Sequence, residues 1–377
     1  MWAGFGLRLD LARPPPQRDV KQEQETGVRI TVLASMRNEG PFIVEWVCWY
    51  RMLGFTDIVV VTNNCTDHSP QLLDALQAAG WLHHIRHDIA PGQRITRAKL
   101  AAARDHKAVR RANWLMVCDV DEFLVIHRGN GMIADLIDLG PEPAYLGMSI
   151  NWRVFGTSNR RAFEDRPVHR QFLYACAKDE TKSRFIKSIY RMAKYFGGIG
   201  EHTPRRFGFE KAGKVWGEPG MIWVNSAGHK VARWAPRDRY MTVMPLGGVT
   251  HEVAQINHYQ LRSEESFSLK KGTLSPVGLE NRYREVYFEA ANAGQEVDTS
   301  AFRYSARFDA LYVAAMALPD VARLHALCCA DHVKAIVEKA GGRAEDDPRY
   351  AAFLQTAAEM AKGAADFPAA PQDPSNP

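Results

Sequence analysis

The feature that most constrains this chain is a repeated order of apolar run, polar loop and helix-like segment between residues 28 and 118. β-Branched runs occupy 28–33 and 58–61, a short run lies at 84–86, and an apolar run fills 114–118. Strands that alternate with helices in this way are typical of a parallel sheet covered by helices. The sequence therefore predicts an α/β fold whose ligands bind at the carboxyl ends of the strands.

The segments between these runs carry helix signals. Apolar residues at helical spacing follow Pro41 and stop before Gly54: Phe42, Trp46, Trp49 and Leu53. Ser69 and Pro70 form an N-cap and N1 pair for a second helix, and a third helix is expected over 96–111. One face of the first helix should be buried against the sheet.

Length and composition predict one large globular unit with further segments attached. With 46% apolar and 24% charged residues among 377, the chain is unlike disordered, collagenous or coiled-coil proteins. We expect two polar tails at 1–27 and 366–377 to be disordered. Between them we expect two halves of one α/β unit, at 28–150 and 151–275, and a C-terminal helical appendage at 276–365 whose apolar stripe packs in the core.

Charge and cysteine content predict the surroundings of the protein. The net charge of +5 is spread along the chain, which favours phosphate-bearing ligands or an anionic membrane surface only weakly. The six cysteines form no C-x-x-C pair, and no apolar run is long enough to span a bilayer. We therefore expect a cytoplasmic protein, peripheral at the inner membrane face if its acceptor is lipid-linked, and no nucleic-acid partner.

Three polar clusters follow the expected strands: Arg37-Asn38-Glu39, Asn63-Asn64-Cys65-Thr66-Asp67 and Asp119-Val120-Asp121-Glu122. Asn and Asp after a strand are often plain turn residues, but three such loops in succession indicate a site. In Asp119-x-Asp121 the spacing puts both carboxylates on one side of an extended segment, where they can share one hard cation.

These motifs resemble those of glycosyltransferase family 2 and of the related family 92. Later segments continue the resemblance in order: Trp152 to Gly156, Lys187 to Ile189, Glu201 to Pro204 and Ile256 to Phe267. The resemblance covers about residues 28–271 and implies a GT-A type fold, Rossmann-like with a mostly parallel sheet. It also implies transfer of a sugar from a nucleoside-diphosphate donor, with uridine as the expected base, to a glycan or other hydroxyl acceptor.

The resemblance also implies site residues. Arg37, Asn38 and Glu39, together with Asn63, Asn64 and Asp67, would bind the base and ribose. Asp119 would bind the ribose or the metal, Asp121 would bind Mn²⁺ or Mg²⁺ directly, and His258 would complete the metal ligands. An aromatic residue is missing from the segment 93–99, which leaves the donor preference open.

Several of these positions also admit a purely structural reading. His258 beside Tyr259 is compatible with a hydrogen-bonded core histidine. Lys270 and Lys271 could neutralise a diphosphate, but they are also compatible with a solvated helix face. Arg262 is expected to neutralise the diphosphate, and Lys187 to reach phosphate or acceptor. The expected catalytic bases for an inverting transfer are Glu201, His202 and Asp165, whereas a retaining enzyme would need no such base.

Two other functions share the early α/β pattern. A nucleotidyltransferase should carry a Gly-rich, Lys-ended phosphate loop after the first strand, which 35–40 lacks. A catalytically idle nucleotide-sugar or carbohydrate-binding module would lack the metal carboxylates, which this sequence has. A D-x-D-x-T phosphatase is disfavoured because Phe123 stands where Thr is required.

Overall fold

The computed structural model describes residues 27–90, 95–140, 142–232, 241–273, 283–292, 294 and 296–365. The two tails expected to be disordered lie outside these residues, apart from Gly27. Gln93 and Arg94 of the segment with the missing aromatic residue also lie outside.

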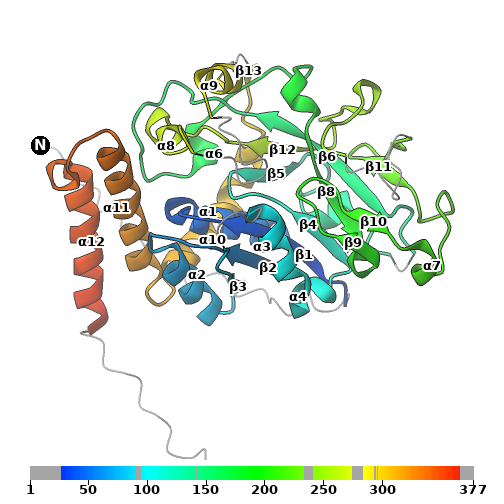
Figure 1. Ribbon diagram of the computed structural model, residues 1–377, viewed down its shortest axis with the longest axis horizontal. Helices are drawn as coiled ribbons and strands as arrows, with labels where there is room; N and C mark the ends of the chain where they lie inside the picture. Colours follow the sequence, from blue (N-terminus) through cyan, green and yellow to red (C-terminus); the bar gives the residue numbers. More distant parts are fainter. Residues whose placement is uncertain are drawn as a thin grey trace, which may run out of the picture.

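The first half of the sheet is parallel, as the sequence predicts. Its strands run in the order β3-β2-β1-β4 and are joined by helices (Figure 1). Their bounds are β1 Ile30–Met36, α1 Gly40–Met52, β2 Asp57–Thr62, α2 Ser69–Ala78, β3 His83–Arg86 and β4 Trp114–Val117. The predicted N-cap of α2 is wrong by one residue, because the N-cap is His68 and Ser69 and Pro70 are the first two helical residues.

The helix expected over 96–111 is two helices. The first, α3 Ile95–Arg104, ends before Asp105, and the second, α4, covers Lys107–Arg110. His106 has an extended backbone, and its side chain accepts a hydrogen bond from the Ala108 amide. A capping residue in extended conformation starts a new helix, so the continuous helix prediction was wrong here.

The second half of the sheet is mixed, which the sequence did not predict. The order continues β8-β6-β12-β5, with β11 paired to β6, and β8 runs antiparallel to both β4 and β6. The bounds are β5 Glu122–Ile126, β6 Gly147–Val154, β8 Ile186–Arg191, β11 Trp223–Asn225 and β12 Ala254–His258. β12 is parallel to β6 and antiparallel to β5.

The sheet must curl, because consecutive strands β4 and β5 stand four positions apart in it. Four strand spacings would separate them by about 19 Å in a flat sheet. The five Cα steps from Val117 to Glu122 reach at most about 17 Å when fully extended. A curled sheet shortens this distance and folds the far edge, with β12, back over the end of β4.

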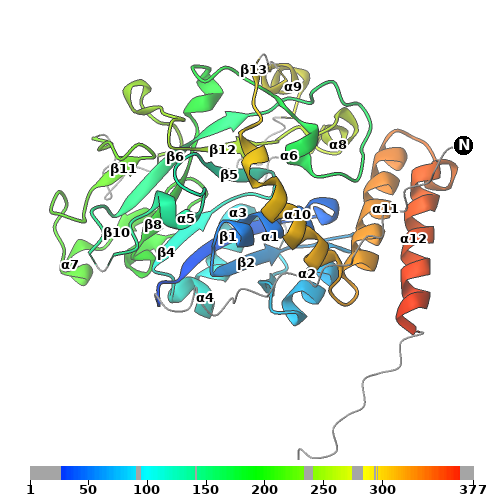
Figure 2. The same cartoon turned by 180° about the vertical axis from the view of Figure 1, so that it is seen from behind.

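Helices cover both faces of the parallel half. Ile30, Val32, Ala34 and Met36 of β1 pack on the face that holds α1, α2 and the C-terminal helices. Leu33 packs on the opposite face with residues of α3 and α4 and with the short strands β9 (Phe196–Gly198) and β10 (Arg205–Phe207) (Figures 1 and 2). This alternation is the two-residue period of a strand that is buried on both sides.

The C-terminal helices share the main hydrophobic core with the sheet and α1. Helices α10 Ser305–Met316 and α11 Val321–Lys339 pack on α1, and α12 Pro348–Ala365 packs on α11 (Figure 2). A Cβ at Gly40 would collide with Cys328, so Gly40 permits the close approach of α11. No single described helix is long and apolar enough to cross a bilayer, although the bent pair Ser300–Met316 and Val321–Lys339 passes together by length and composition.

The segment after residue 275 is less regular than expected. Helix α9 covers only Glu285–Ala291, and Leu279 lies outside the described residues. The sequence predicts an apolar helix face made of Leu279, Tyr283, Val286, Tyr287 and Ala290. Tyr287 packs against Phe267, but Val286 is 74% exposed, so this prediction is wrong at Val286.

The remaining described elements are short and connect these layers. They are α5 Ile133–Leu136, α6 Val168–Gln171, β7 Tyr174–Ala175, β9 Phe196–Gly198, β10 Arg205–Phe207, α7 Phe209–Ala212, α8 Glu264–Ser268, β13 Glu296–Val297 and the 3₁₀ turns Thr181–Arg184, Ala193–Tyr195, Leu246–Gly248, Ser300–Tyr304 and Ala344–Asp346.

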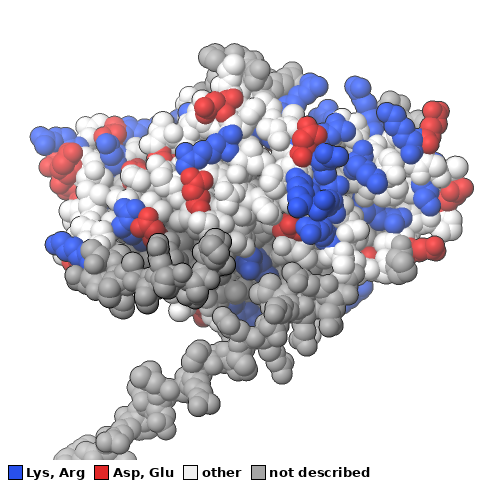
Figure 3. All heavy atoms as spheres, turned by 90° about the horizontal axis from the view of Figure 1, so that it is seen from below, with Lys and Arg blue, Asp and Glu red and all other residues white. Residues whose placement is uncertain are grey.

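The surface charge is uneven on the face seen from below. Lys and Arg side chains gather on the right half of this face, with few acidic side chains among them (Figure 3). The expected contact with an anionic membrane stays a prediction, and this basic area is the surface on which to test it.

His332 makes the docking of α11 sensitive to acid. Its ring nitrogen Nε2 forms a hydrogen bond with Ser266 Oγ at 3.0 Å, and the ring packs edge-on against Phe42. Burial, followed by the charges of Arg262 and Arg349, lowers the pKa of His332 from 6.5 to about 3. The free energy of unfolding therefore has its full value for this group above pH 6.5, and it falls as the pH drops from 6.5 toward 3, because the unfolded chain binds the proton more tightly.

We predict that His332→Gln flattens this dependence. Between about pH 7.5 and about pH 4.5 the free energy of unfolding of the unchanged protein should fall by about 2 to 3 kcal/mol more than that of the variant. Glutamine can keep a hydrogen bond to Ser266 without a proton-binding ring. Urea unfolding across this pH range measures the difference, and parallel curves for both proteins would contradict the prediction.

Candidate active site

The loops after β1 and β2 are tied together by a pair of hydrogen bonds. Asn38 Nδ2 donates to Thr66 Oγ1 at 2.8 Å, and the Thr66 amide donates to Asn38 Oδ1 at 2.8 Å. Asn38 adopts a left-handed backbone with φ of 54°. The structure therefore brings together two of the three polar clusters, with Arg37 exposed at the same strand end.

Most side chains of the second cluster have local partners. The Asp67 carboxylate accepts hydrogen bonds from the amide and hydroxyl of Ser69, the first residue of α2, at 3.1 and 2.6 Å. Asn63 is buried and donates to Asn64 Oδ1 at 3.1 Å, while Asn64 is exposed. Asp67 thus holds the start of α2, and its expected role in nucleotide binding stays a prediction.

The third cluster is a tight turn and not the extended segment that the spacing suggested. The Glu122 amide donates to the Asp119 carbonyl at 3.0 Å, which closes a turn between β4 and β5. The Asp119 amide donates to Glu122 Oε2 at 2.9 Å. In this turn the Asp119 and Asp121 carboxylates meet different lysines.

Lys187 of β8 lies under this turn and is fully buried. Its Nζ is 2.7 Å from Asp119 Oδ2 and 3.0 Å from Glu122 Oε2. Burial lowers the pKa of Lys187, but the two carboxylates outweigh burial and hold it well above its usual value. Burial raises the pKa of Glu122 to about 7 against the effect of Lys187, whereas Lys187 holds the pKa of Asp119 below its usual value despite burial.

Asp121 lies beside groups from the far end of the sheet. Its Oδ1 is 3.6 Å from His258 Nε2, and its Oδ2 accepts from Lys270 Nζ at 3.2 Å. Burial raises the pKa of Asp121, but Lys270 and then His258 hold it well below the usual range. His258 reaches this position because it is paired with Glu122 across β12 and β5.

Aromatic rings form one wall of the site. Trp152 stacks on Phe185 with centroids 4.9 Å apart and lies 4.2 Å from the ring of His258. His202 lies 5.7 Å from Trp152, and its Nδ1 donates to the Ile186 carbonyl at 2.7 Å. Burial, followed by the charge of Lys187, lowers the pKa of His202 to about 4, so this ring is neutral at neutral pH.

Arg262 closes the site beside the first loop. Its Nη1 donates to Glu39 Oε2 at 2.8 Å, and its guanidinium lies 3.4 Å from the centroid of Phe42. The side chain is 5% exposed, and its Nε and Nη2 have no hydrogen-bond partner among the residues described. Buried donors of this kind are normally satisfied, so these two point to an acceptor supplied by a ligand.

The three expected bases do not share one place. Glu201 and His202 lie near Lys187. The charge of Glu201 contributes to the raised pKa of Lys187, and the charge of Asp119 acts on the pKa of His202. Asp165 instead contacts His325 of α11 at 2.9 Å. The contact with His325 gives the Asp165 carboxylate a partner outside the turn, and its expected role as a base stays a prediction.

Sequence reasoning missed four residues of the site. Lys270 was assigned to a solvated helix face, and Glu122 and Trp152 were quoted within motifs without a role. Lys99 of α3 is buried, and burial lowers its pKa to about 8 while Asp119 acts in the opposite direction. A buried lysine four positions into a helix gives no sequence signal, because nothing local distinguishes it from a surface lysine.

The side chains present suit a hard divalent cation by ligand type, but Asp119, Asp121 and His258 do not bring three ligand atoms within 4.8 Å of one another. Asp119 and Asp121 supply carboxylate oxygens, and His258 directs Nε2 toward the Asp121 carboxylate. Oxygen ligands with one imidazole suit Mn²⁺ or Mg²⁺, and no thiolate joins them among the described residues. Lys187 and Lys270 already neutralise both aspartates, so a cation would compete with Lys270 for Asp121.

Comparison with known proteins places the chain among the glycosyltransferases. More particularly, the family model of glycosyltransferase family 92 matches residues 33–213, which is just under half of the chain. A family 92 protein of Arabidopsis thaliana is 27% identical over 119 residues, which cover 30% of this chain and 20% of the relative. The chain thus spans about a fifth of that relative's length. His258, Arg262 and Lys270 lie beyond the matched segment.

Solved structures of the S. aureus protein TarS are also similar. Residues 1–349 of TarS match at 11% identity with a TM-score of 0.29, covering 89% of this chain and 92% of TarS. The same fragment in complex with UDP has a TM-score of 0.31 at equal identity and coverage. Since both TM-scores are low, the fold description rests on the strand order given above.

We predict that Lys187 stabilises the turn by compensating Glu122. Lys187→Met leaves a buried carboxylate without its partner and should lower the free energy of unfolding by about 3 to 5 kcal/mol. The double variant Lys187→Met with Glu122→Gln should recover much of this loss. The exposed Lys178→Met is a matched control that should change stability by less than about 0.5 kcal/mol. Urea unfolding measures all four proteins, and equal losses in the single and double variants would refute the pairing.

Proposed function

We propose that this chain transfers a sugar from a nucleoside-diphosphate donor, with UDP as the expected nucleotide, to a hydroxyl group of a glycan or lipid-linked acceptor. One observation carries the proposal. Within the segment that matches family 92, the Asp119–Glu122 turn at the carboxyl end of β4 places Asp121 3.6 Å from His258, which comes from the opposite edge of the sheet. Convergence of distant polar groups on a strand end is typical of a nucleotide site in an α/β sheet.

Asp119, Asp121 and His258 would hold Mn²⁺ or Mg²⁺ in this proposal. A bound cation would supply Lewis-acid stabilisation of the departing diphosphate. Arg262 would donate from Nε and Nη2 to the same leaving group, which gives these buried donors the acceptor that they lack in the protein. Asn38, Asn63 and Asn64 would contact the nucleoside, with Arg37 and Glu39 beside them.

The acceptor side would lie near Glu201 and His202, in an inverting reaction. Because His202 donates from Nδ1 to a carbonyl, its Nε2 carries the lone pair. Its pKa of about 4 makes it a weak base at neutral pH. We therefore favour Glu201 as the group that removes the acceptor proton, with His202 positioning the acceptor hydroxyl.

The second candidate is a catalytically idle nucleotide-sugar-binding module. It is favoured by the charge balance of the site, since Lys187 and Lys270 neutralise Asp119 and Asp121 without a cation. Binding of UDP that is unaffected by manganese, with no turnover of any nucleotide sugar, would support this candidate. A thermal-shift screen of nucleotide sugars with and without manganese separates the two, because specific binding raises the melting temperature.

We predict that Asp121→Ala abolishes sugar transfer and weakens UDP binding in the presence of manganese. Removal of one oxygen ligand should leave too few groups to hold the cation, while the fold survives. The exposed Asp179→Ala is the control for loss of one negative charge and should behave like the unchanged protein. Calorimetric titration of UDP and a transfer assay measure both effects. Full activity in excess chelator would rule out metal dependence.

We predict that Arg262→Lys slows transfer more than it weakens donor binding. Lysine keeps the charge opposite Glu39 but cannot donate from two fixed nitrogens to the leaving diphosphate. Loss of such a donor costs about 3 kcal/mol, or on the order of a hundredfold in the single-turnover rate. Measurement of this rate together with the donor dissociation constant shows whether the substitution affects transfer more than binding. A change in affinity with an unchanged rate would assign Arg262 to binding alone.

A further inference from the structure

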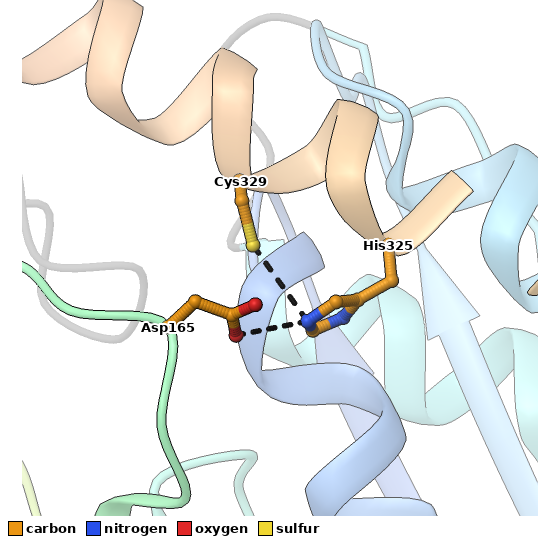
Figure 4. Close-up of side chains that lie close together, drawn as sticks. All are labelled: Asp165, His325 and Cys329. Carbon is orange, nitrogen blue, oxygen red and sulfur yellow. Dashed lines mark hydrogen bonds and ion pairs between the residues drawn. The ribbon is translucent and has the colours of Figure 1, made fainter. Parts of the chain in front are cut away.

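A second group of ligand-type side chains lies outside the proposed active site. Asp165 comes from the loop between β6 and α6, and His325 and Cys329 come from α11 (Figure 4). The spacing of four residues places His325 and Cys329 on one face of the helix. Figure 4 shows all three side chains pointing toward a common point between the loop and the helix.

The three potential ligand atoms have the separations of a small cation site. His325 Nε2 is 2.9 Å from Asp165 Oδ1 and 3.7 Å from Cys329 Sγ, and all three atoms lie within 4.8 Å of one another. A tetrahedral centre with zinc bonds of about 2.0 to 2.3 Å separates its ligand atoms by roughly 3.3 to 3.6 Å. On binding zinc, the distance from His325 Nε2 to Asp165 Oδ1 would widen by a few tenths of an ångström, and the distance from His325 Nε2 to Cys329 Sγ would shorten slightly.

Two side chains of this group contact the same nitrogen atom of the His325 ring. Both Asp165 and Cys329 approach the same ring nitrogen, Nε2, which can carry only one proton. His325 Nδ1 is buried and has no hydrogen-bond partner among the described residues. A nucleophilic triad would place the acid and the thiol on opposite nitrogens of the ring, so this arrangement is not a Cys-His-Asp catalytic unit.

Charge also favours a divalent cation at this point. Cys329 is fully buried. A thiolate and a carboxylate would together balance two positive charges, so the centre as a whole would be neutral in the core. The side chain of Asp165 is 34% exposed, which leaves room for a water molecule as the fourth ligand.

We propose that Asp165, His325 and Cys329 bind a zinc-class divalent cation that pins the loop before α6 to the C-terminal helix α11. Thiolate, imidazole and carboxylate together suit Zn²⁺, whereas the oxygen-rich group at Asp121 suits a harder ion. The site is structural, because it joins two segments that are 160 residues apart in the chain. It does not depend on the proposed sugar transfer.

The first experiment measures metal content. Untagged protein purified from zinc-supplemented medium should contain about one zinc ion per chain by mass spectrometry. Cys329→Ala and His325→Ala should fall to background, whereas Cys328→Ala should keep the ion. Cys328 is a chemical match on the same helix, also fully buried, and lies outside the group. Cobalt in place of zinc should give a thiolate charge-transfer band that only Cys329→Ala and His325→Ala lack.

The second experiment measures stability and assigns the ion to this site. Zinc chloride added to chelator-treated protein should raise the melting temperature of the unchanged protein, Cys328→Ala and Asp121→Ala, but not of Cys329→Ala. An ordinary Asp165–His325 ion pair with a packed thiol predicts no zinc and no shift in any protein. That result, zinc retained by Cys329→Ala, or zinc lost from Asp121→Ala would each overturn the proposal.

Discussion

The buried ammonium of Lys187 is the interaction on which the site depends. It contacts Asp119 and Glu122 from below the turn that joins β4 to β5. Glu122 in turn accepts a hydrogen bond from the Asp119 amide, so the backbone of the turn and the charge beneath it support each other. Without that positive charge the fully buried Glu122 carboxylate, and the partly exposed Asp119 carboxylate beside it, would have no charge to compensate them.

The curl of the sheet is the second condition for the site. Because the connection from β4 to β5 is short, the far edge of the sheet returns toward the strand that precedes the acidic turn. β12 then pairs with β5 and sets His258 opposite Glu122, while the chain that follows brings Arg262 to Glu39 and Lys270 to Asp121. A flat sheet of the same strands would leave these cations remote from the carboxylates.

The C-terminal helices support the same region from outside. Helix α11 contacts α1, α2 and α8, which are the helices that follow the first polar loop, the second polar loop and β12. His332 meets Ser266 and Phe42, and His68 meets Asp331 at 2.6 Å. The helix therefore braces three segments that carry site residues, and it packs the C-terminal helices and the glycosyltransferase domain around a shared core.

The sequence by itself determined the parallel half of the fold and the positions of its polar loops. Strand and helix periods are local properties, and β1, β2 and β4 with α1 and α2 lie where those periods place them. The Asp119-x-Asp121 pair and the order of the later motifs were readable for the same reason. Even there, His106 broke an expected helix by capping a new one, which helical spacing does not reveal.

Tertiary structure alone decided which distant residues join those loops. Lys270 and Lys99 look like surface lysines in sequence, and only the packing of the chain after β12 and of α3 brings them beside carboxylates. Lys187 was expected to reach phosphate or acceptor, and the packing of β8 buries it against Asp119 and Glu122. The sequence suggested Asp165 as a catalytic base, and in the structure its carboxylate contacts His325 of α11. Pairing between remote segments depends on sheet curvature and helix docking, and neither leaves a periodic signal in the residues that it brings together.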